Sequence, residues 1–162
     1  MRVVYFPELP LEKIQLSGLN RHPEYLSERS MEAKFGDANS NYGDDILESI
    51  RKHGQLDPSF GTYKETSDQW SKELGKWTTV NSGKWVIEPG QTRWMALYKL
   101  KRLTQKVLVL VKDEDEPFFH MLGNSEHREI KTMEDAFPLF TDKNNLPNKG
   151  YYYLKRKKWL SL

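Results

Sequence analysis

The chain has 162 residues, of which 37% are hydrophobic and 30% are charged, and its formal net charge at pH 7 is only +2. These values predict one folded domain, and the net charge alone does not favour a nucleic-acid binder. The absence of cysteine excludes disulfide bonds, thiolate metal sites and a cysteine nucleophile. No apolar stretch approaches the ~20 residues of a membrane span, and the first residues lack the apolar core of a signal peptide. We therefore expect a soluble, cytoplasmic protein without a membrane partner.

The N-terminal half is predicted to contain short strands separated by surface segments. The β-branched and aromatic residues 2–6 indicate an opening strand, whereas residues 16–43, rich in Asn, Ser, Gly and charge, indicate a long loop. Residues 59–63 indicate another strand after a proline, and the polar residues 64–76 suggest an insertion over the surface. Two further short strands, WTTV and KWVI, are expected to be joined by a tight turn at residues 81–83.

The segment DDILESIRKHG, residues 44–54, predicts the first helix. Asp45 followed three residues later by Glu48 matches a capping box, and Gly54 stands where a left-handed residue commonly ends a helix. The apolar face of this helix consists of Ile46, Leu47 and Ile50. Their spacing predicts a helix that packs with one face on the core.

A junction between a strand and a helix follows. The apolar run Trp85-Val86-Ile87 stops at Glu88-Pro89-Gly90, and a pattern of helical period then extends from about Gln91 to Arg102. Its expected core face consists of Ala96, Leu97, Leu100 and Leu103. Arg93 lies in the first turn of this helix, on the side of that apolar face. The run KVLVLV, residues 106–111, then indicates a strand buried on both faces.

The C-terminal third predicts two more helices and a basic tail. Glu116-Pro117 opens the first helix, with proline at its favoured first position. The side chains expected to face inward from it are Phe118, Met121 and Leu122. Thr132 caps the second helix, which Pro138 is expected to kink or shorten. The last residues, 146–162, are basic and aromatic.

The alternation of strands and helices predicts an α/β or α+β fold, with a small mixed sheet and flanking helices in one compact unit. We expect a domain over residues 1–145, with its core at 44–140 and the surface insertion at 64–76, followed by the basic aromatic tail at 146–162. The acidic residues 113–116 fit a solvated loop before a helix better than a metal site.

Arg93 is a cation at the start of a predicted helix, where cations are mildly unfavourable. The unpaired N–H groups and the positive dipole end of a helix favour an anion at this place, and Gly90 would let the anion approach closely. An arginine adds a planar, permanently charged fork for phosphate oxygens. The junction therefore predicts a phosphate site, and the alternative is a surface arginine without a ligand.

Three stretches, taken in order, resemble the ParB N-terminal and sulfiredoxin-like family. ILESIRKHGQLDP (46–58) is similar to that family's helix followed by a G-x-x-x-P turn. GQTRWMA (90–96) is similar to its G-x-x-R-x-x-A phosphate motif, and GNSEHREIKTMEDA (123–136) to its E-N-x-x-R segment and the helix after it. The order and spacing agree over roughly residues 44–140. The resemblance implies a ParB/sulfiredoxin-like fold and a nucleotide or phosphate held at the N-terminus of the helix that begins near Gln91.

The resemblance also implies which residues form the site. Arg93 would hold the phosphate, and further phosphate- or nucleotide-binding residues would be Gly90, Gln91, Thr92, Gly54, Pro58, Asn124 and Arg128. Glu88 is the candidate metal ligand or base, with Mg²⁺ as the expected cofactor, and the catalytic candidates are Glu88, Arg93 and His127. Each position also has a plain structural explanation: a helix end and turn at Gly54 and Pro58, a solvated strand end at Glu88, and a polar helix end after Gly123.

Three departures from the family limit the activities to be expected. Sulfiredoxin needs a cysteine where Gln91 stands, so sulfinic-acid repair is excluded. Too few residues follow Ala136 for the helix-turn-helix domain of a partition ParB, so centromere recognition is not expected. Gln91 and Thr92 replace the Glu and Arg of the nucleotide-hydrolysing members, and Gly123 replaces a second glutamate. These losses put hydrolysis of that type in doubt and leave phosphate binding intact.

The leading functional hypothesis is therefore a nucleotide- or phosphate-binding enzyme that performs phosphotransfer, or hydrolysis of a nucleoside triphosphate or phosphodiester as a nuclease would, in nucleic-acid metabolism. The first alternative is a non-catalytic DNA- or RNA-binding protein that uses the same cleft and the basic tail, Lys155, Arg156, Lys157 and Lys158. The tail also has a purely structural explanation, in which Tyr151-Tyr152-Tyr153 form a last strand and the lysines are solvated. The second alternative is a catalytically inactive interaction scaffold. Small stand-alone members of such families are common in bacteriophages and plasmids, so the resemblance is compatible with that origin.

Overall fold

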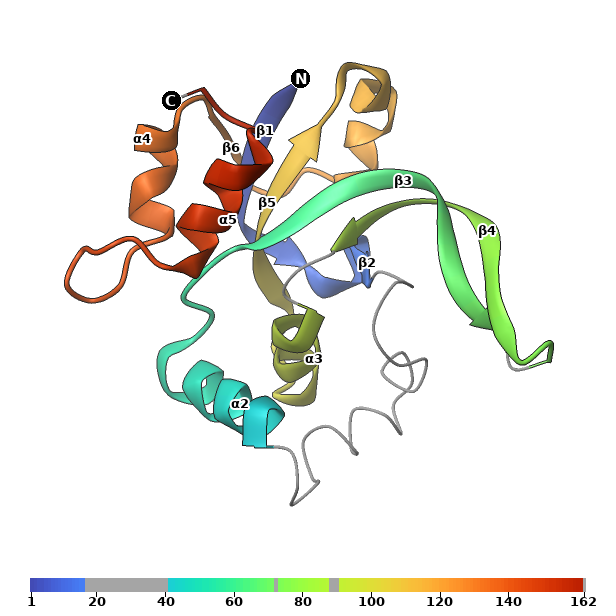
Figure 1. Cartoon of the computed structure of the whole chain (residues 1–162), viewed down its shortest axis with the longest axis horizontal. Coiled ribbons are helices and arrows are strands. Elements are labelled where there is room, and N and C mark those ends of the chain that lie inside the picture. Colours follow the sequence, from blue (N-terminus) through green and yellow to red (C-terminus); the bar gives the residue numbers. More distant parts are fainter. Residues whose placement is uncertain (17–40, 72, 88–90, 162) are drawn as a thin grey trace.

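The computed structural model describes residues 1–16, 41–71, 73–87 and 91–161, and six of its segments pair into one mixed sheet (Figure 1). The strands are β1 (Arg2–Pro10), β2 (Gln15–Leu16), β3 (Ser59–Ser71), β4 (Lys76–Ile87), β5 (Thr104–Val111) and β6 (Arg128–Ile130), in the order β2-β4-β3-β5-β1-β6. The pairs β2–β4 and β3–β5 are parallel, and the other three pairs are antiparallel. The predicted α/β class with a small mixed sheet is confirmed.

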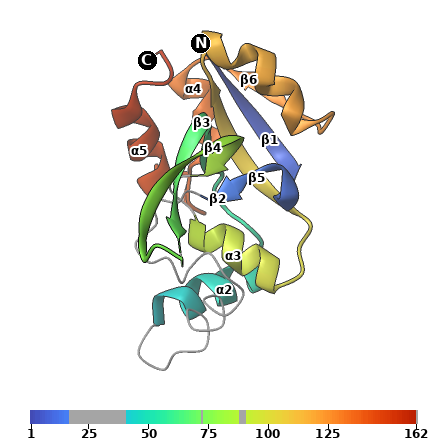
Figure 2. The ribbon, with the colours of Figure 1, turned by 90° about the vertical axis from the view of Figure 1, so that its right-hand side faces the viewer.

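Helices flank this sheet on both faces and at one end. They are η1 (Leu11–Lys13), α2 (Asn41–His53), α3 (Gln91–Lys99), η3 (Asp113–Leu122), α4 (Met133–Ala136), η4 (Phe137–Leu139) and α5 (Lys149–Lys157). In the two ribbon views α2 and α3 lie together at one end of the sheet, and α4 and α5 lie together on one face (Figures 1 and 2). No helix within the described ranges is long and apolar enough to cross a lipid bilayer.

Strand β5 joins the two main hydrophobic clusters, which lie on opposite faces of the sheet. Leu108 and Leu110 belong to the cluster under α4 and α5, whereas Val107, Val109 and Val111 belong to the cluster that includes Leu122 of η3. Successive side chains of a strand point to opposite faces. A continuous apolar run is therefore what a central strand with two covered faces requires, and the prediction for residues 106–111 is confirmed.

The basic aromatic segment forms helix α5, which packs on the sheet. Leu154 is fully buried in the cluster that includes Phe60, and Tyr153 lies against the same Phe60 with ring centroids 4.7 Å apart. Asn148 caps the helix, since its Oδ1 accepts a hydrogen bond of 3.1 Å from the backbone N–H of Tyr151. The alternative of a last strand at residues 151–153 is wrong, because the cap and the buried Leu154 favour a helix in this segment.

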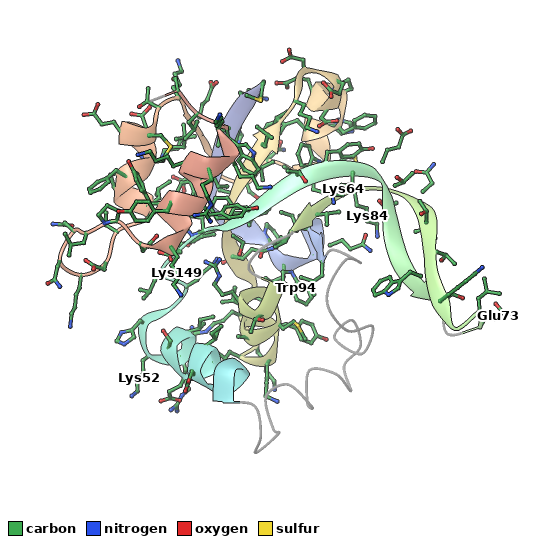
Figure 3. The ribbon with its side chains drawn as sticks, in the orientation of Figure 1. Lys52, Lys64, Glu73, Lys84, Trp94 and Lys149 are labelled. Carbon is green, nitrogen blue, oxygen red and sulfur yellow. The ribbon has the colours of Figure 1, made fainter. Side chains whose placement is uncertain are left out.

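The chain from Ser59 to Ile87 forms one long hairpin that curves away from the body (Figure 1). Within the predicted surface insertion at residues 64–76, residues 64–71 belong to β3 and Lys76 begins β4, whereas residue 72 lies outside the described residues. The predicted turn at residues 81–83 is wrong, because these residues lie within β4. Gly83 has a positive φ of 50°, and the register shifts between Lys64 and Thr66 on the facing strand. The positive φ of Gly83 therefore accommodates the register shift between β3 and β4. This shift lies close to the paired Lys64 and Lys84 (Figure 3).

The helix ends differ from prediction at two places. Helix α2 begins at Asn41, so Asp45 lies inside it and the predicted capping box at Asp45 is wrong. The Glu48 carboxylate instead forms an ion pair with Arg51, with Oε1 2.5 Å from Nη2. Helix α3 ends at Lys99 because the chain turns at Lys101, which adopts a left-handed φ of 58°. The predicted loop at 16–43 falls mostly on residues outside the described ranges.

Three apolar side chains expected in the core face solvent instead. Leu103, placed beyond the end of α3, is 82% exposed. Phe118 and Met121 are also exposed, because η3 has 3₁₀ rather than α geometry and starts at Asp113 with Pro117 inside it. The capping residue Thr132 is confirmed, since its side chain accepts from the backbone N–H of Asp135 at 3.2 Å. Helix α4 is short, as Pro138 predicts.

The packing of α5 predicts that the C-terminal segment contributes to global stability. Leu154→Ala should lower the free energy of unfolding by about 2–5 kcal/mol, because it removes a fully buried side chain and leaves a cavity. The matched control is Tyr152→Ala on the exposed face of the same helix, which should change it by no more than about 0.5 kcal/mol. Urea denaturation measures both, and equal losses for the two variants would contradict the packing of α5 described above.

Candidate functional site

Arg93 lies in the first turn of α3 and contacts the turn that joins α2 to β3. Its Nη1 donates a hydrogen bond to the carbonyl oxygen of Asp57 at 2.9 Å and lies 3.3 Å from that of Pro58. The side chain is half-buried. The contact brings together the segments that carry the first two sequence motifs. We call residues Gly54–Pro58 the α2–β3 turn.

Gln55 holds the α2–β3 turn against the sheet. Its side chain is buried, and its amide nitrogen donates to the carbonyl oxygens of Asp57 at 2.9 Å and Lys106 at 3.0 Å. Its amide oxygen accepts from the backbone N–H of Lys106 at 2.6 Å. Both ends of the buried amide are therefore satisfied, which a buried polar side chain needs. No pattern in the sequence predicts this role, since a single glutamine between Gly54 and Pro58 resembles any loop residue.

Asp57 connects the same turn to α5. Its carboxylate accepts a hydrogen bond of 2.7 Å from Nδ2 of Asn148, the residue that caps α5. Burial raises the pKa of the Asp57 carboxyl above the ordinary value of 3.8, although the charge of Arg93, the Asn148 hydrogen bond and the charge of Lys106 act in the opposite direction. A half-buried carboxyl beside an arginine is a candidate functional group that the sequence motifs do not single out.

Gly54 and Pro58 occupy the positions that their structural explanation requires. Gly54 has a left-handed φ of 72°, and its N–H closes the end of α2 on the carbonyl of Ile50 at 2.8 Å. A side chain at Gly54 would meet no atom within 4 Å, so backbone conformation rather than crowding explains the glycine. Pro58 is buried. Their expected contact with a nucleotide stays a prediction.

The N-terminus of α3 is formed as the sequence predicts. The helix starts at Gln91, and Thr92 is half-buried beside Arg93. Glu88, the candidate base and metal ligand, and Gly90 lie outside the described residues. Within the described ranges, no three Asp, Glu or His side chains come together in a way that could hold a metal ion.

The third motif lies away from Arg93. Both ribbon views place α3 and the chain before β6 toward opposite ends of the sheet (Figures 1 and 2). His127 packs between aromatic rings, with centroids 5.2 Å from Phe6 and 5.5 Å from Phe119, and the Arg128 guanidinium lies 5.4 Å from the centre of the Tyr5 ring. Asn124 is exposed. These contacts support the plain structural explanation of this segment, and its role in phosphate binding stays untested.

The basic residues of α5 remain accessible on the surface. The side chains of Lys155, Arg156, Lys157 and Lys158 are all exposed in the last turn of the helix and at its end. Cations at a helix C-terminus complement the helix dipole, which is sufficient to explain their place. Nucleic-acid binding by this cluster stays a prediction.

Comparisons with known proteins add one similarity. No protein-family model and no curated protein matches the chain. Among solved structures, the chain is similar to the crystal structure of sulfiredoxin from Arabidopsis thaliana, with 20% sequence identity over 72% of this chain and 96% of that one, at a TM-score of 0.38.

The raised pKa of Asp57 predicts a pH-dependent contribution to stability. Above pH 3.8 and below its raised pKa, the folded protein holds the proton more tightly than the unfolded chain, so the free energy of unfolding falls as the pH rises through this window. Asp57→Asn keeps an oxygen acceptor for Asn148 and removes the titration. Its stability relative to the wild type should therefore increase with pH across the window.

Urea denaturation of both proteins at a series of pH values from below 3.8 to 7 measures this difference. The other carboxyl groups titrate in both proteins and cancel in the comparison. A difference that does not vary with pH, or that decreases as the pH rises, would contradict the burial of the Asp57 carboxyl.

Proposed function

We propose that the chain is a ParB/sulfiredoxin-like protein that binds the phosphate of a nucleotide at the N-terminus of α3. The observation that carries the proposal is the contact between Arg93 and the carbonyls of the α2–β3 turn. It supports the proposal because two of the three family-like motifs meet at this place, although they are separate in the sequence. Arg93, Thr92 and the first backbone N–H groups of α3 would bind the phosphate.

The N-terminus of α3 and the Arg93 side chain, which is held by the turn, both favour an anion at this place. The first N–H groups of α3 have no partners within the helix, and the dipole makes this end positive. The bonds from Arg93 to the turn limit the freedom of its guanidinium, so less side-chain entropy is lost when an anion binds beside it. The resulting positive charge at a helix start favours a phosphate over a neutral ligand.

Chemistry at this site is the second part of the proposal. Asp57 is a half-buried carboxyl that the charge of Arg93 influences, and its raised pKa suits a group that accepts a proton from an attacking water or hydroxyl. Phosphotransfer or hydrolysis of a nucleoside triphosphate would use it in place of the missing family glutamates. Mg²⁺ would arrive bound to the nucleotide phosphates, and Glu88 is the candidate ligand that the family resemblance implies.

Ligand-induced stabilisation tests phosphate binding directly. Thermal unfolding of the wild type would be followed with each nucleoside triphosphate, inorganic phosphate and a short DNA, with and without Mg²⁺. A ligand at 100 times its dissociation constant stabilises the folded protein by about 2.7 kcal/mol, which shifts the melting temperature measurably. We expect a shift with a nucleotide that Arg93→Ala abolishes and that Arg93→Lys reduces, because lysine keeps the charge but lacks the planar fork.

The matched control for these variants is Arg51→Ala, which removes an exposed arginine from α2. It should leave the ligand-induced shift unchanged. The absence of a shift with every ligand, or an equal shift in the wild type and in Arg93→Ala, would contradict the proposal. If Arg93→Ala does not fold, Arg93→Lys, which keeps a donor for the turn, decides the question.

A second candidate function is DNA or RNA binding through α5, favoured by the four exposed cations at its C-terminal end. Removing the segment after residue 153 would not test it, since Leu154 is part of the core. Charge reversal at Lys155→Glu and Arg156→Glu keeps the buried face and should weaken binding to duplex DNA. Each lost phosphate contact should make the negative slope of log K against log salt concentration shallower by about 0.9. Unchanged affinity and slope in filter-binding assays would exclude α5 from binding.

A further inference from the structure

The C-terminal end of α3 lines an open pocket of about 900 Å³ that the phosphate proposal does not use. Its walls come from the junction of β1 and η1, from α3 and from the start of β5. We call it the α3 groove, and the residues that matter below are Trp94, Tyr98, Lys99, Lys101, Arg102 and Leu103. Its volume lies within the range of about 300–1,000 Å³ that is typical of ligand sites.

Aromatic and aliphatic side chains form the floor of the α3 groove. Trp94 lies on α3 (Figure 3), and its ring is nearly parallel to that of Tyr98, with an interplanar angle of 6° and centroids 5.6 Å apart. The indole N–H of Trp94 donates to the carbonyl of Leu11 at 3.2 Å, which fixes this ring against η1. Tyr98 is 50% exposed and Leu103 is 82% exposed. Neighbouring large apolar side chains exposed in this way indicate a binding surface.

The rim of the α3 groove is positively charged. Lys99, Lys101 and Arg102 are exposed, whereas Glu12 is the single acidic side chain among the lining residues. The turn that presents them is well defined, because the backbone N–H of Arg102 donates to the carbonyl of Leu97 at 2.9 Å and Lys101 adopts a left-handed conformation. Three cations therefore border the aromatic floor, and the charge of the groove complements an anionic ligand.

We propose that the α3 groove binds single-stranded nucleic acid, with bases stacked beside Tyr98 and Leu103 and phosphates paired with Lys99, Lys101 and Arg102. Stacking surfaces bordered by cations are how proteins hold single strands without sequence preference. Cations spread over four successive residues match the successive phosphates of a strand better than the single phosphate group of a mononucleotide. A flat aromatic floor favours planar bases over the side chains of an acidic peptide.

This inference does not rest on a phosphate site at Arg93. Residues 93 and 94 are successive in the helix, so their side chains leave α3 about 100° apart. Arg93 contacts the α2–β3 turn, whereas Trp94 lines the groove. Variants at Tyr98 and variants at Arg93 therefore test separate claims, and either claim can fail alone.

Fluorescence anisotropy with a 5′-labelled oligothymidine of about twelve nucleotides tests the proposal at low salt. Tyr98→Ala should weaken binding at least about fivefold, because it removes the exposed stacking surface. Tyr98→Phe keeps the ring and should bind within about twofold of the wild type. The matched control is Tyr152→Ala on α5, since Tyr152 is 48% exposed and Tyr98 is 50% exposed. It should also leave the affinity unchanged.

The salt dependence of binding tests whether the cations of the α3 groove contact phosphates. Lys101→Ala combined with Arg102→Ala should make the negative slope of log K against log salt concentration shallower by about 1.4, the value for two phosphate contacts to a single strand. The matched control is Lys131→Ala combined with Lys143→Ala, which removes two exposed lysines outside the α3 groove and outside α5 and should keep the wild-type slope.

Four results would overturn the proposal. They are no binding of the oligothymidine by the wild type, an affinity of Tyr98→Ala equal to that of the wild type, displacement by thymidine monophosphate at equal phosphate concentration, and displacement by polyglutamate at equal charge. The last two would assign the α3 groove to a mononucleotide or to an acidic peptide. If Tyr98→Ala melts well below the wild type, the comparison of Tyr98→Phe with the alanine pair at Lys101 and Arg102 decides the question.

Discussion

The carbonyl oxygens of the α2–β3 turn contact the Arg93 side chain, and the arrangement of the helices around the sheet depends on this turn. Gln55 ties it to β5, and the Asp57 carboxylate ties it to the cap of α5 through Asn148. One short loop thereby connects α2, α3, β5 and α5. A typical hydrogen bond contributes only about 1 kcal/mol net, but a buried polar group left without its partner costs about 1–3 kcal/mol. The network is therefore expected to act as a unit, and a change at Arg93 affects both the proposed ligand site and the fold.

Helix α3 has nine residues and presents three different faces. Its buried face, with Met95, Ala96 and Leu97, packs on α2 and η1. Arg93 contacts the α2–β3 turn, and the stacked Trp94 and Tyr98 line the α3 groove. The helical period of 3.6 residues separates these faces without any additional element. If both proposals hold, one helix would present a phosphate site at its first turn and a stacking surface near its last turn.

Features that depend on short-range sequence pattern, or on whether a residue is apolar, could be predicted from the sequence. The apolar run of β5, the left-handed Gly54 and the cap at Thr132 are of this kind, because side-chain period, backbone freedom and short-range hydrogen bonding decide them. Predictions failed where long-range pairing decides. A glycine at residue 83 suits a turn or an irregular strand equally well, and only its pairing with β3 distinguishes the two. Gln55 shows the same limit within the site, since its role depends on a partner fifty-one positions away.

The proposed anion site lies where Arg93 meets the start of α3. A titration of ¹⁵N-labelled protein with the nucleotide that stabilises it most, followed by NMR at the backbone amides and at the arginine Nε–H groups, tests this most directly. We expect the signals of the Arg93 Nε–H and of the Gln91 and Thr92 amides to shift with one common dissociation constant, while the signal of the Arg51 Nε–H does not shift. Shifts confined to α5 or to the α3 groove, with Arg93 and the start of α3 unchanged at saturation, would contradict it.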